Sequence, residues 1–235
     1  MTLNRPDPVT DRFAYSRTAL ARLVLSFEQR DLADRAAAGV PTNDAFMNGG
    51  EMVEECVGLV EQAQEVLRRA VIWERQKGTS WEEIGERLGG ISRQAAHERY
   101  KAAVDEWQQS LVEPYGPEVR GYRSPILHEA ALEPTATGRR LDAWARKHVP
   151  SAREDEHPVT GHLPHLSAAE EVVQVLEAIN HMNETDASPA ERAVVYDRKA
   201  ALLERIAAED GKPEAAEQAA DARVRAARLR DEAGA

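Results

Sequence analysis

Cysteine is almost absent from this sequence, because Cys56 is the only one among 235 residues. A single cysteine excludes an intramolecular disulfide and is typical of a protein from a reducing compartment. Cys56 falls on the apolar face of a predicted helix, where small hydrophobic side chains are normally buried. We therefore expect Cys56 to be a buried core residue and not a reactive thiol.

Long hydrophobic runs and aromatic side chains are scarce as well. No stretch approaches the roughly 18 consecutive apolar residues of a membrane span, and the N-terminal sequence MTLNRPDPVTDR lacks the apolar core of a signal peptide. Aromatic residues make up 5% of the chain, and runs of β-branched residues are few. Ala, Glu and Arg are abundant instead, which favours helices. We expect an all-α cytoplasmic protein that makes no membrane contact.

A general excess of positive charge is also missing, since the formal net charge is −11. This balance argues against a protein that coats nucleic acid non-specifically over its whole surface. It remains compatible with a small basic edge, which a dimer can present while the rest of its surface stays acidic.

Patterns for catalysis, cofactors and metals are lacking too. The sequence contains no Gly-rich phosphate loop after a strand and no nucleophile elbow, so we expect no enzyme activity and no cofactor. Four histidines and two acidic residues gather near residue 155, but their spacing matches no metal-ligand motif, and we expect a solvated loop without a metal. The six residues are His148, Asp155, Glu156, His157, His162 and His165.

Helical periodicity organises the N-terminal part of the chain. Apolar spacing predicts one helix over residues 11–38 and a longer one over 51–77. The longer helix contains a heptad seam, widened by neighbouring valines and a leucine. A stripe this wide leaves two interpretations open, namely burial within one subunit alone and an additional role in a dimer interface. The seam comprises Met52, Cys56, Leu59, Ala63, Val66, Ala70 and Trp73.

Breaks in the helical pattern divide the chain into three predicted regions. We expect residues 1–112 to form a helical N-terminal domain. Prolines and glycines interrupt residues 113–166, which predicts a linker with one short helix near 139–148 and no strand. Capping patterns at Ser167 and Ser188 begin helices in a C-terminal region, residues 167–235, that we expect to serve dimerisation or the binding of a protein partner.

A helix-turn-helix pattern occupies residues 79–109. Ile84 and Leu88 lie four residues apart on one face of a short first helix, and Gly85 between them permits two helices to cross closely. Gly89 supplies the positive φ that a tight turn requires. The second helix, residues 93–109, then has the length to lie in the major groove of DNA.

The outward face of this second helix is polar. Arginine can donate two hydrogen bonds to guanine, and glutamine can pair with adenine, so an Arg-Gln pair at the start of the helix suits base recognition. Hydroxyl and lysine side chains nearby suit the phosphate backbone. The candidate DNA-binding residues are Lys77, Thr79, Ser80, Ser92, Arg93, Gln94, His97 and Lys101.

The sequence SWEEIGERLGGISRQAAHERY resembles the helix-turn-helix of bacterial regulators with a SWxEIGxxLGxSRQAAxxR core, common in actinobacteria and their plasmids and phages. The resemblance covers about residues 66–104. Regulators of this kind usually turn on Leu-Gly-x-Ser. Here the turn, from Leu88 to Ser92, is one residue longer than in that pattern. The extra residue affects the angle of the second helix relative to the first.

The residues and the resemblance together predict a sequence-specific regulator of transcription that binds double-stranded DNA, namely a dimeric repressor that reads the major groove with residues 93–109. One reading helix offers few base contacts, so specificity requires two copies about one DNA turn apart. A short helix, a glycine turn and a longer helix also occur in helical bundles. The alternative is therefore a helical adaptor or anti-regulator whose helix-turn-helix does not bind DNA.

Overall fold

The structure, a computed structural model, describes residues 11–42, 48–120, 122–184 and 187–234. These residues are predominantly helical, which confirms the predicted all-α class. The stretch MTLNRPDPVT, on which the prediction of no signal peptide depends, lies outside the described residues. None of the described helices is both long and apolar enough to cross a bilayer.

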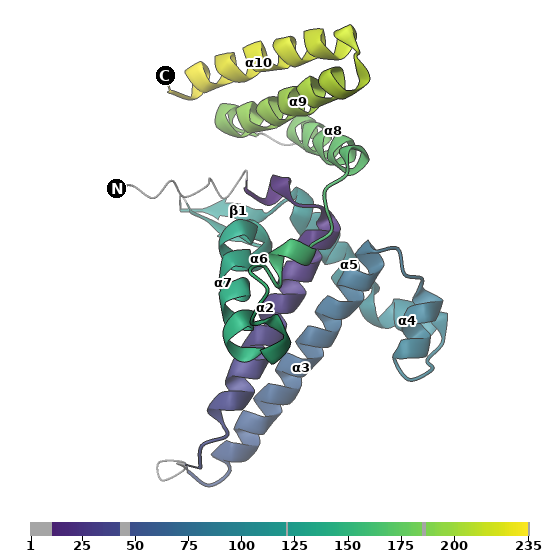
Figure 1. Cartoon of the computed structure of the whole chain (residues 1–235), viewed down its shortest axis with the longest axis vertical. Helices are drawn as coiled ribbons and strands as arrows, with labels where there is room; N and C mark the ends of the chain where they lie inside the picture. The colour runs from purple at the N-terminus through teal and green to yellow at the C-terminus, as the bar shows by residue number, and fades with distance from the viewer. Residues whose placement is uncertain (1–10, 43–47, 121, 185–186, 235) are drawn as a thin grey trace. The chain divides into compact units, whose positions relative to one another are not determined.

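The chain divides into two compact units at the junction of residues 165 and 166. In the first unit, long helices are followed by a short hairpin and further helices (Figure 1). Its elements are η1 (Arg12–Ala14), α2 (Arg17–Ala38), α3 (Glu51–Gln76), α4 (Trp81–Arg87), α5 (Arg93–Val112), β1 (Tyr115–Val119), β2 (Tyr122–Pro125), α6 (Glu129–Leu132), α7 (Pro134–His148), η2 (Pro150–Ala152) and η3 (Thr160–His162).

Helices α2 and α3 pack antiparallel along the first unit. Near one end of the pair, Nε of Arg35 lies 2.8 Å from Oε1 of Glu55. Near the other end, the Thr18 hydroxyl donates a hydrogen bond of 3.3 Å to the carbonyl oxygen of Gln76. The two contacts show that the helices stay in contact over most of their length.

The principal core forms where α2, α3, α5 and α6 meet. Each large apolar side chain that is fully buried there contributes about 1.5–3 kcal/mol relative to leaving it exposed. A smaller cluster joins α2 to α7 and the segment beyond it through Ala19, Leu23, Leu141 and Leu163. The buried members of the principal core are Leu20, Ala21, Val24, Ile72, Val104, Trp107, Leu111, Leu127, Ala130, Ala131 and Leu132.

All but the last of residues 113–166 belong to the first unit, which ends at His165, so the prediction of a linker there is wrong. The prediction of no strand is wrong as well, because β1 and β2 form an antiparallel hairpin. The expected short helix begins at Pro134, five residues before the predicted start. Apolar residues such as Leu127 and Leu141 stand too far apart in this stretch to show a period. They are buried through contacts with α2, which lies about a hundred residues away in the sequence.

The predicted loop near residue 155 is held by a buried carboxylate. Oδ1 of Asp142 accepts hydrogen bonds from the backbone N–H groups of Val159 and Thr160, at 2.7 and 3.0 Å. His157 and His162 lie exposed on this loop. The described part of the chain contains no group of three or more side chains that could hold a metal ion.

The seam predicted on α3 is only partly buried. Leu59, Val66 and Trp73 are half-buried, whereas Met52 is exposed. Cys56 is exposed too, so the prediction of a buried cysteine is wrong. The N-terminal part of the seam is exposed because α2 covers a different face of α3.

The second unit comprises α8 (Ala168–Glu184), α9 (Pro189–Asp210) and α10 (Pro213–Gly234). The predicted capping box at Ser188 begins α9. Helix α10 packs on α9 with alanines, since Ala215, Ala219, Ala222 and Ala226 are buried. The weak apolar pattern of residues 213–233 therefore reflects a close helix pair that needs only small side chains.

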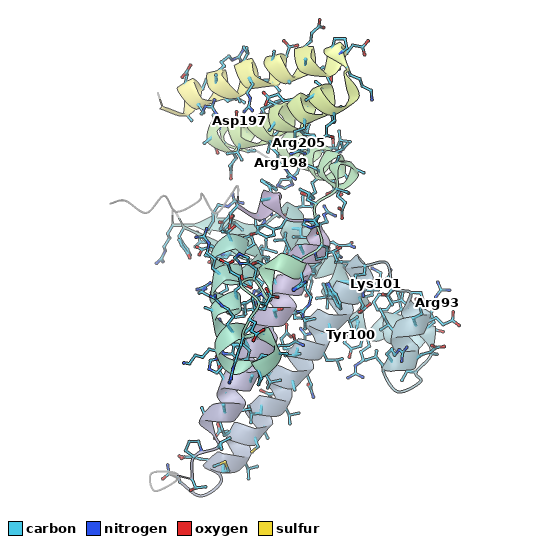
Figure 2. All side chains as sticks on the ribbon, in the orientation of Figure 1. Arg93, Tyr100, Lys101, Asp197, Arg198 and Arg205 are labelled. Carbon is cyan, nitrogen blue, oxygen red and sulfur yellow. The ribbon has the colours of Figure 1, made fainter. Side chains whose placement is uncertain are left out.

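A basic side chain lies inside the second unit (Figure 2). Arg198 on α9 is largely buried, and this burial lowers its pKa to about 10. The carboxylate of Glu171 on α8 lies 3.9 Å from Nε of Arg198 and pairs with Arg205 as well. The acidic residue therefore joins α8 to α9 through two guanidinium groups.

In the first unit, a histidine and a glutamate link α2 to α6. Oε1 of Glu28 lies 3.0 Å from Nε2 of His128, whose Nδ1 accepts a hydrogen bond from the N–H of Ala130. Because Nδ1 accepts, Nε2 carries the proton and donates a hydrogen bond to the carboxylate. This hydrogen bond lowers the pKa of Glu28, partial burial opposes the shift, and the positive charges of Arg69 and Arg30 add to it.

We predict that Glu28→Gln destabilises the protein near neutral pH and that the difference disappears in acid. A carboxylate with a lowered pKa stabilises the folded state above its ordinary pKa of about 4.5. That stabilisation is lost as the pH falls through the lowered value. Urea denaturation of both proteins from neutral pH to about pH 3 measures it, with the exposed Glu129→Gln as control. A difference that stays constant with pH would contradict the assignment.

Candidate nucleic-acid interface

Helix α4 begins with a capping box. The hydroxyl of Ser80 accepts a hydrogen bond from the N–H of Glu83, and the Glu83 carboxylate accepts one of 2.8 Å from the N–H of Ser80. The Ser80 hydroxyl also donates a hydrogen bond of 2.7 Å to this carboxylate, and this bond, together with the weaker effect of the Ser80 N–H, lowers the pKa of Glu83. Thr79, directly before Ser80, donates its hydroxyl to Glu74 at 2.6 Å. Ser80 and Thr79 therefore both have structural roles at the start of α4.

Two glycines form the turn between α4 and α5. Gly89 and Gly90 have φ values of +95° and +80°, which side chains with a Cβ rarely adopt. Ser92 then caps α5 by accepting a hydrogen bond from the N–H of Ala95. Two helices joined by a glycine turn thus lie where they were predicted, and α5 extends three residues beyond the predicted end at residue 109.

Gly85 is the point of closest approach between α4 and the segment after the turn. A Cβ built on Gly85 would overlap the carbonyl oxygen of Ile91. This overlap confirms the prediction that Gly85 permits the close crossing. The overlapping atom belongs to the backbone, which cannot move aside by changing a rotamer as a side chain could.

The α4–α5 pair packs on the C-terminal end of α3. Val71 of α3 is buried with Ile84 of α4 and with Ala96 and Tyr100 of α5. Trp81 at the start of α4 is packed against this cluster. These contacts hold one side of α5 against the protein, so the opposite side faces outward.

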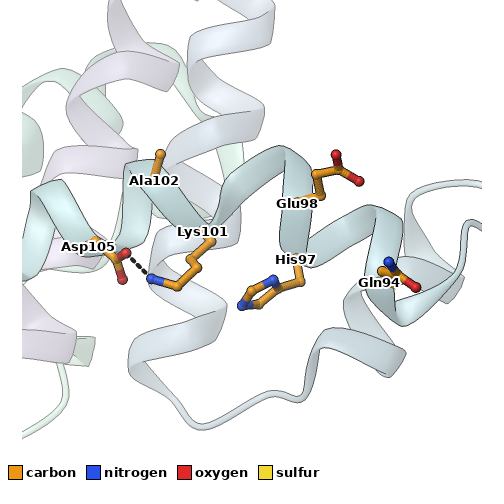
Figure 3. A pocket seen from close by; sticks show the side chains of 6 residues that line it. All are labelled: Gln94, His97, Glu98, Lys101, Ala102 and Asp105. Atoms are coloured by element: carbon orange, nitrogen blue, oxygen red, sulfur yellow. Dashed lines mark hydrogen bonds and ion pairs between the residues drawn. The ribbon is translucent and has the colours of Figure 1, made fainter.

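The outward side of α5 carries an open hollow (Figure 3). Exposed Gln94, His97 and Lys101 follow one another along it at intervals of three and four residues. Two acidic residues, Glu98 and Asp105, line it as well. The predicted polar face is therefore present, with both signs of charge.

Several candidate residues have partners within the protein. Nζ of Lys101 pairs with the carboxylate of Asp105, one helical turn later. The ring of His97 contacts the Trp81 ring edge to face, with 5.4 Å between the ring centroids. Nζ of Lys77 lies 3.2 Å from Oε1 of Glu74. Lysines 77 and 101 are therefore partly neutralised, and His97 is positioned by an aromatic contact.

Arg93 and Gln94 differ from the other candidates. Both are exposed in the first turn of α5 (Arg93 is labelled in Figure 2), and no hydrogen bond or ion pair of their side chains appears among the described residues. They stand beside the N-terminus of the helix, whose backbone N–H groups favour anions such as phosphate. These two side chains are the most accessible to a ligand.

Two residues with roles at this site were not predicted. Trp81 supports His97 and also lies under the guanidinium of Arg75, whose Cζ is 4.8 Å from the centre of its ring. No periodic signal identifies such a residue in the sequence. Asp105 could have been found, because it lies four residues after Lys101, the spacing of helical ion pairs.

Comparisons with known proteins give no support for a role of α4 and α5. No protein-family model, no curated protein and no solved structure matches the chain. The functional assignment therefore depends on the chemistry of the exposed side chains themselves.

We predict that Gly85→Ala destabilises the first unit by about 1–3 kcal/mol, the usual cost of overpacking. The added methyl group must displace the Ile91 carbonyl and with it the turn. Chemical denaturation followed by circular dichroism measures the change. The neighbouring exposed Glu86→Ala is the matched control and should shift stability by less than about 0.5 kcal/mol. Equal stability of the two variants would show that the approach at Gly85 is not required.

Proposed function

We propose that the chain is a sequence-specific DNA-binding regulator of transcription in which α4 and α5 form a helix-turn-helix and α5 enters the major groove. The observation that carries the proposal is the exposure of Arg93 and Gln94 in the first turn of a helix that is packed against the protein on its other side. Recognition helices contact base edges with their N-terminal residues, as this arrangement allows.

The chemistry of the two side chains fits base recognition. The guanidinium of Arg93 can donate two hydrogen bonds to O6 and N7 of guanine, and the amide of Gln94 can pair with N6 and N7 of adenine. The start of α5 and nearby Lys77 suit phosphate contacts, which orient a protein on the duplex without reading its sequence. Binding over a promoter is sufficient for repression, so no further activity is required.

A homodimer is part of this proposal. One helix inserted in the groove reads few bases, and two symmetric copies double both the contacts and the length of the site. The net charge of −11 also limits non-specific affinity, so contact is confined to a small part of the surface.

A second candidate is an adaptor or anti-regulator that binds a protein through the same surface. It is favoured by the acidic residues of the hollow, because Glu98 repels phosphate and Asp105 neutralises Lys101. A protein partner with mixed charge would tolerate both acids.

We predict that Arg93→Ala and Gln94→Ala each weaken binding to a selected DNA site by about 1–3 kcal/mol, because each loses a base contact. The site is obtained by selection from random duplexes with the full chain, and affinities are measured by fluorescence anisotropy. Arg139→Ala on α7 and Gln108→Ala at the far end of α5 are matched controls at exposed positions. Failure to enrich any sequence, or unchanged affinity of both variants, would refute the proposal.

We also predict a steep dependence of this affinity on salt. Each phosphate contact by a cation releases counterions, so the logarithm of the binding constant falls linearly with the logarithm of the salt concentration. Lys77→Ala should lower the slope by about one without changing the preferred sequence. The adaptor alternative expects no preferred sequence and no such slope.

A further inference from the structure

Helix α3 has two opposite faces, and the described residues of the first unit cover only one of them along its length. On the covered face, Glu55 pairs with Arg35 of α2, and Gly58 lies against the same guanidinium. On the opposite face, the exposed fractions are 68% for Val53, 57% for Val60 and 39% for Leu67. Five residues at alternating intervals of four and three form this exposed line, which we call the α3 row. The α3 row is Val53, Val57, Val60, Gln64 and Leu67.

The α3 row continues into an interface that is already formed. The next position at the same spacing is Val71, which is 4% exposed. It is buried by Ile84, Ala96 and Tyr100 of the α4–α5 pair. The pair therefore sits on the same side of α3 as the α3 row, at its C-terminal end, and α4 and α2 lie on different sides of α3 (Figure 1).

We infer that the α3 row is covered by a second copy of this chain, with the two α3 helices antiparallel about a two-fold axis near Val60. Apolar residues at heptad spacing are the pattern by which helices pair side by side. A two-fold axis makes the surface complementary to itself, because every contact then occurs twice.

The position of the α4–α5 pair decides the direction. If the two α3 helices ran parallel, both α4–α5 pairs would lie at the same end and on the same side, and would compete for one space. In the antiparallel arrangement, each pair lies beyond the N-terminal end of the other copy's row. The antiparallel pairing therefore buries Val53 to Leu67 without displacing Val71 from its own contacts.

The residues beside the α3 row agree with this direction. Exposed Glu54 flanks one end, and exposed Arg68, whose Nε lies 3.2 Å from Oε2 of Glu65 in the same helix, flanks the other end on the same side. Antiparallel pairing therefore brings Glu54 close to the partly neutralised Arg68 of the other copy. The other flank has small side chains, Cys56 and Ala63, that permit close approach. The two copies of Glu61 approach each other near the axis, a surface repulsion that weakens the dimer without preventing it.

The arrangement also sets the distance between the two α4–α5 pairs. At about 1.5 Å per residue, Val71 lies about 16 Å along α3 from Val60, so the two copies of Val71 are about 33 Å apart. Half-sites on adjacent turns of DNA are about 34–36 Å apart. This match depends on the proposed function, whereas the interface itself depends only on the apolar row and the position of α4–α5.

The first test measures the mass of the full chain without DNA by analytical ultracentrifugation over the micromolar range. We expect a reversible dimer, and we expect Val60→Glu to weaken it at least about tenfold, because tenfold corresponds to only 1.4 kcal/mol. Val119→Glu is the matched control, since Val119 on β1 is 65% exposed and lies outside both α3 and the C-terminal region. Circular dichroism checks that both variants are folded. A wild-type mass of 26.0 kDa throughout, or unchanged association of Val60→Glu, overturns the inference.

The second test determines direction with cysteines placed in the α3 row, in a Cys56→Ser background because Cys56 is the single cysteine. In the antiparallel dimer the two copies of Val53 are about 21 Å apart along the helix axis, beyond the Cα separation of about 4–7 Å that a disulfide spans, and each lies opposite Leu67 of the other copy. Parallel pairing would place the two copies of Val53 opposite each other. We expect mild oxidation to cross-link a mixture of the Cys56→Ser/Val53→Cys and Cys56→Ser/Leu67→Cys variants and not to cross-link Cys56→Ser/Val53→Cys alone. Cross-linking of Cys56→Ser/Val53→Cys alone, or no cross-linking in the mixture, overturns the antiparallel arrangement.

The two proposals fail separately. The protein can form a dimer that Val60→Glu dissociates and still select no DNA sequence. That result would retain the interface and contradict only the proposed function. Specific binding of DNA by a protein that stays monomeric removes the interface and the homodimer and retains only the sequence-specific binding of DNA.

Discussion

The packing of α3 between α2 and the α4–α5 pair is the constraint on which the first unit depends. Ile72 enters the principal core against α2, and Val71, the adjacent residue, enters the cluster beneath α4 and α5. Neighbouring residues on a helix point about 100° apart, so two consecutive side chains anchor two separate groups of elements. A change at either residue would loosen one group while leaving the other in place.

Helix α5 connects the candidate interface to the interior. Its first turns are exposed on the outward side and carry Arg93 and Gln94, whereas Trp107 and Leu111 near its other end are buried in the principal core. The guanidinium of Arg12 adds a hydrogen bond of 2.7 Å to the carbonyl oxygen of Leu111. A helix held at one end by the core and along one side by α3 presents its polar residues in a defined orientation, as recognition requires.

The charge distribution is compatible with the proposed binding of DNA by a small part of an acidic protein. Cations near α4 and α5 have acidic neighbours, as Lys101 has Asp105 and Lys77 has Glu74. Such pairs are weak on a solvent-exposed surface, so phosphate could replace the carboxylate as the partner. In the proposed function, general attraction to DNA is small, and affinity depends on base contacts and on the presence of two copies. The α3 row supplies the second copy in our proposal.

Local signals in the sequence determined the helix ends and the turn. The caps at Ser80, Ser92 and Ser188 and the glycine turn at residues 89–90 depend on hydrogen bonds and dihedral angles within a few residues, which a sequence records directly. The polar face of α5 followed from the same helical period.

Only the tertiary structure decided which apolar residues are covered. Residues 113–166 join the core because Leu127 meets side chains of α2, and nothing local marks that contact. Cys56 is exposed because α2 covers a different face of α3. Periodicity shows that a helix has an apolar face, but burial is a property of two surfaces. The second surface lies far away in the sequence or, as we propose for the α3 row, in another copy of the chain.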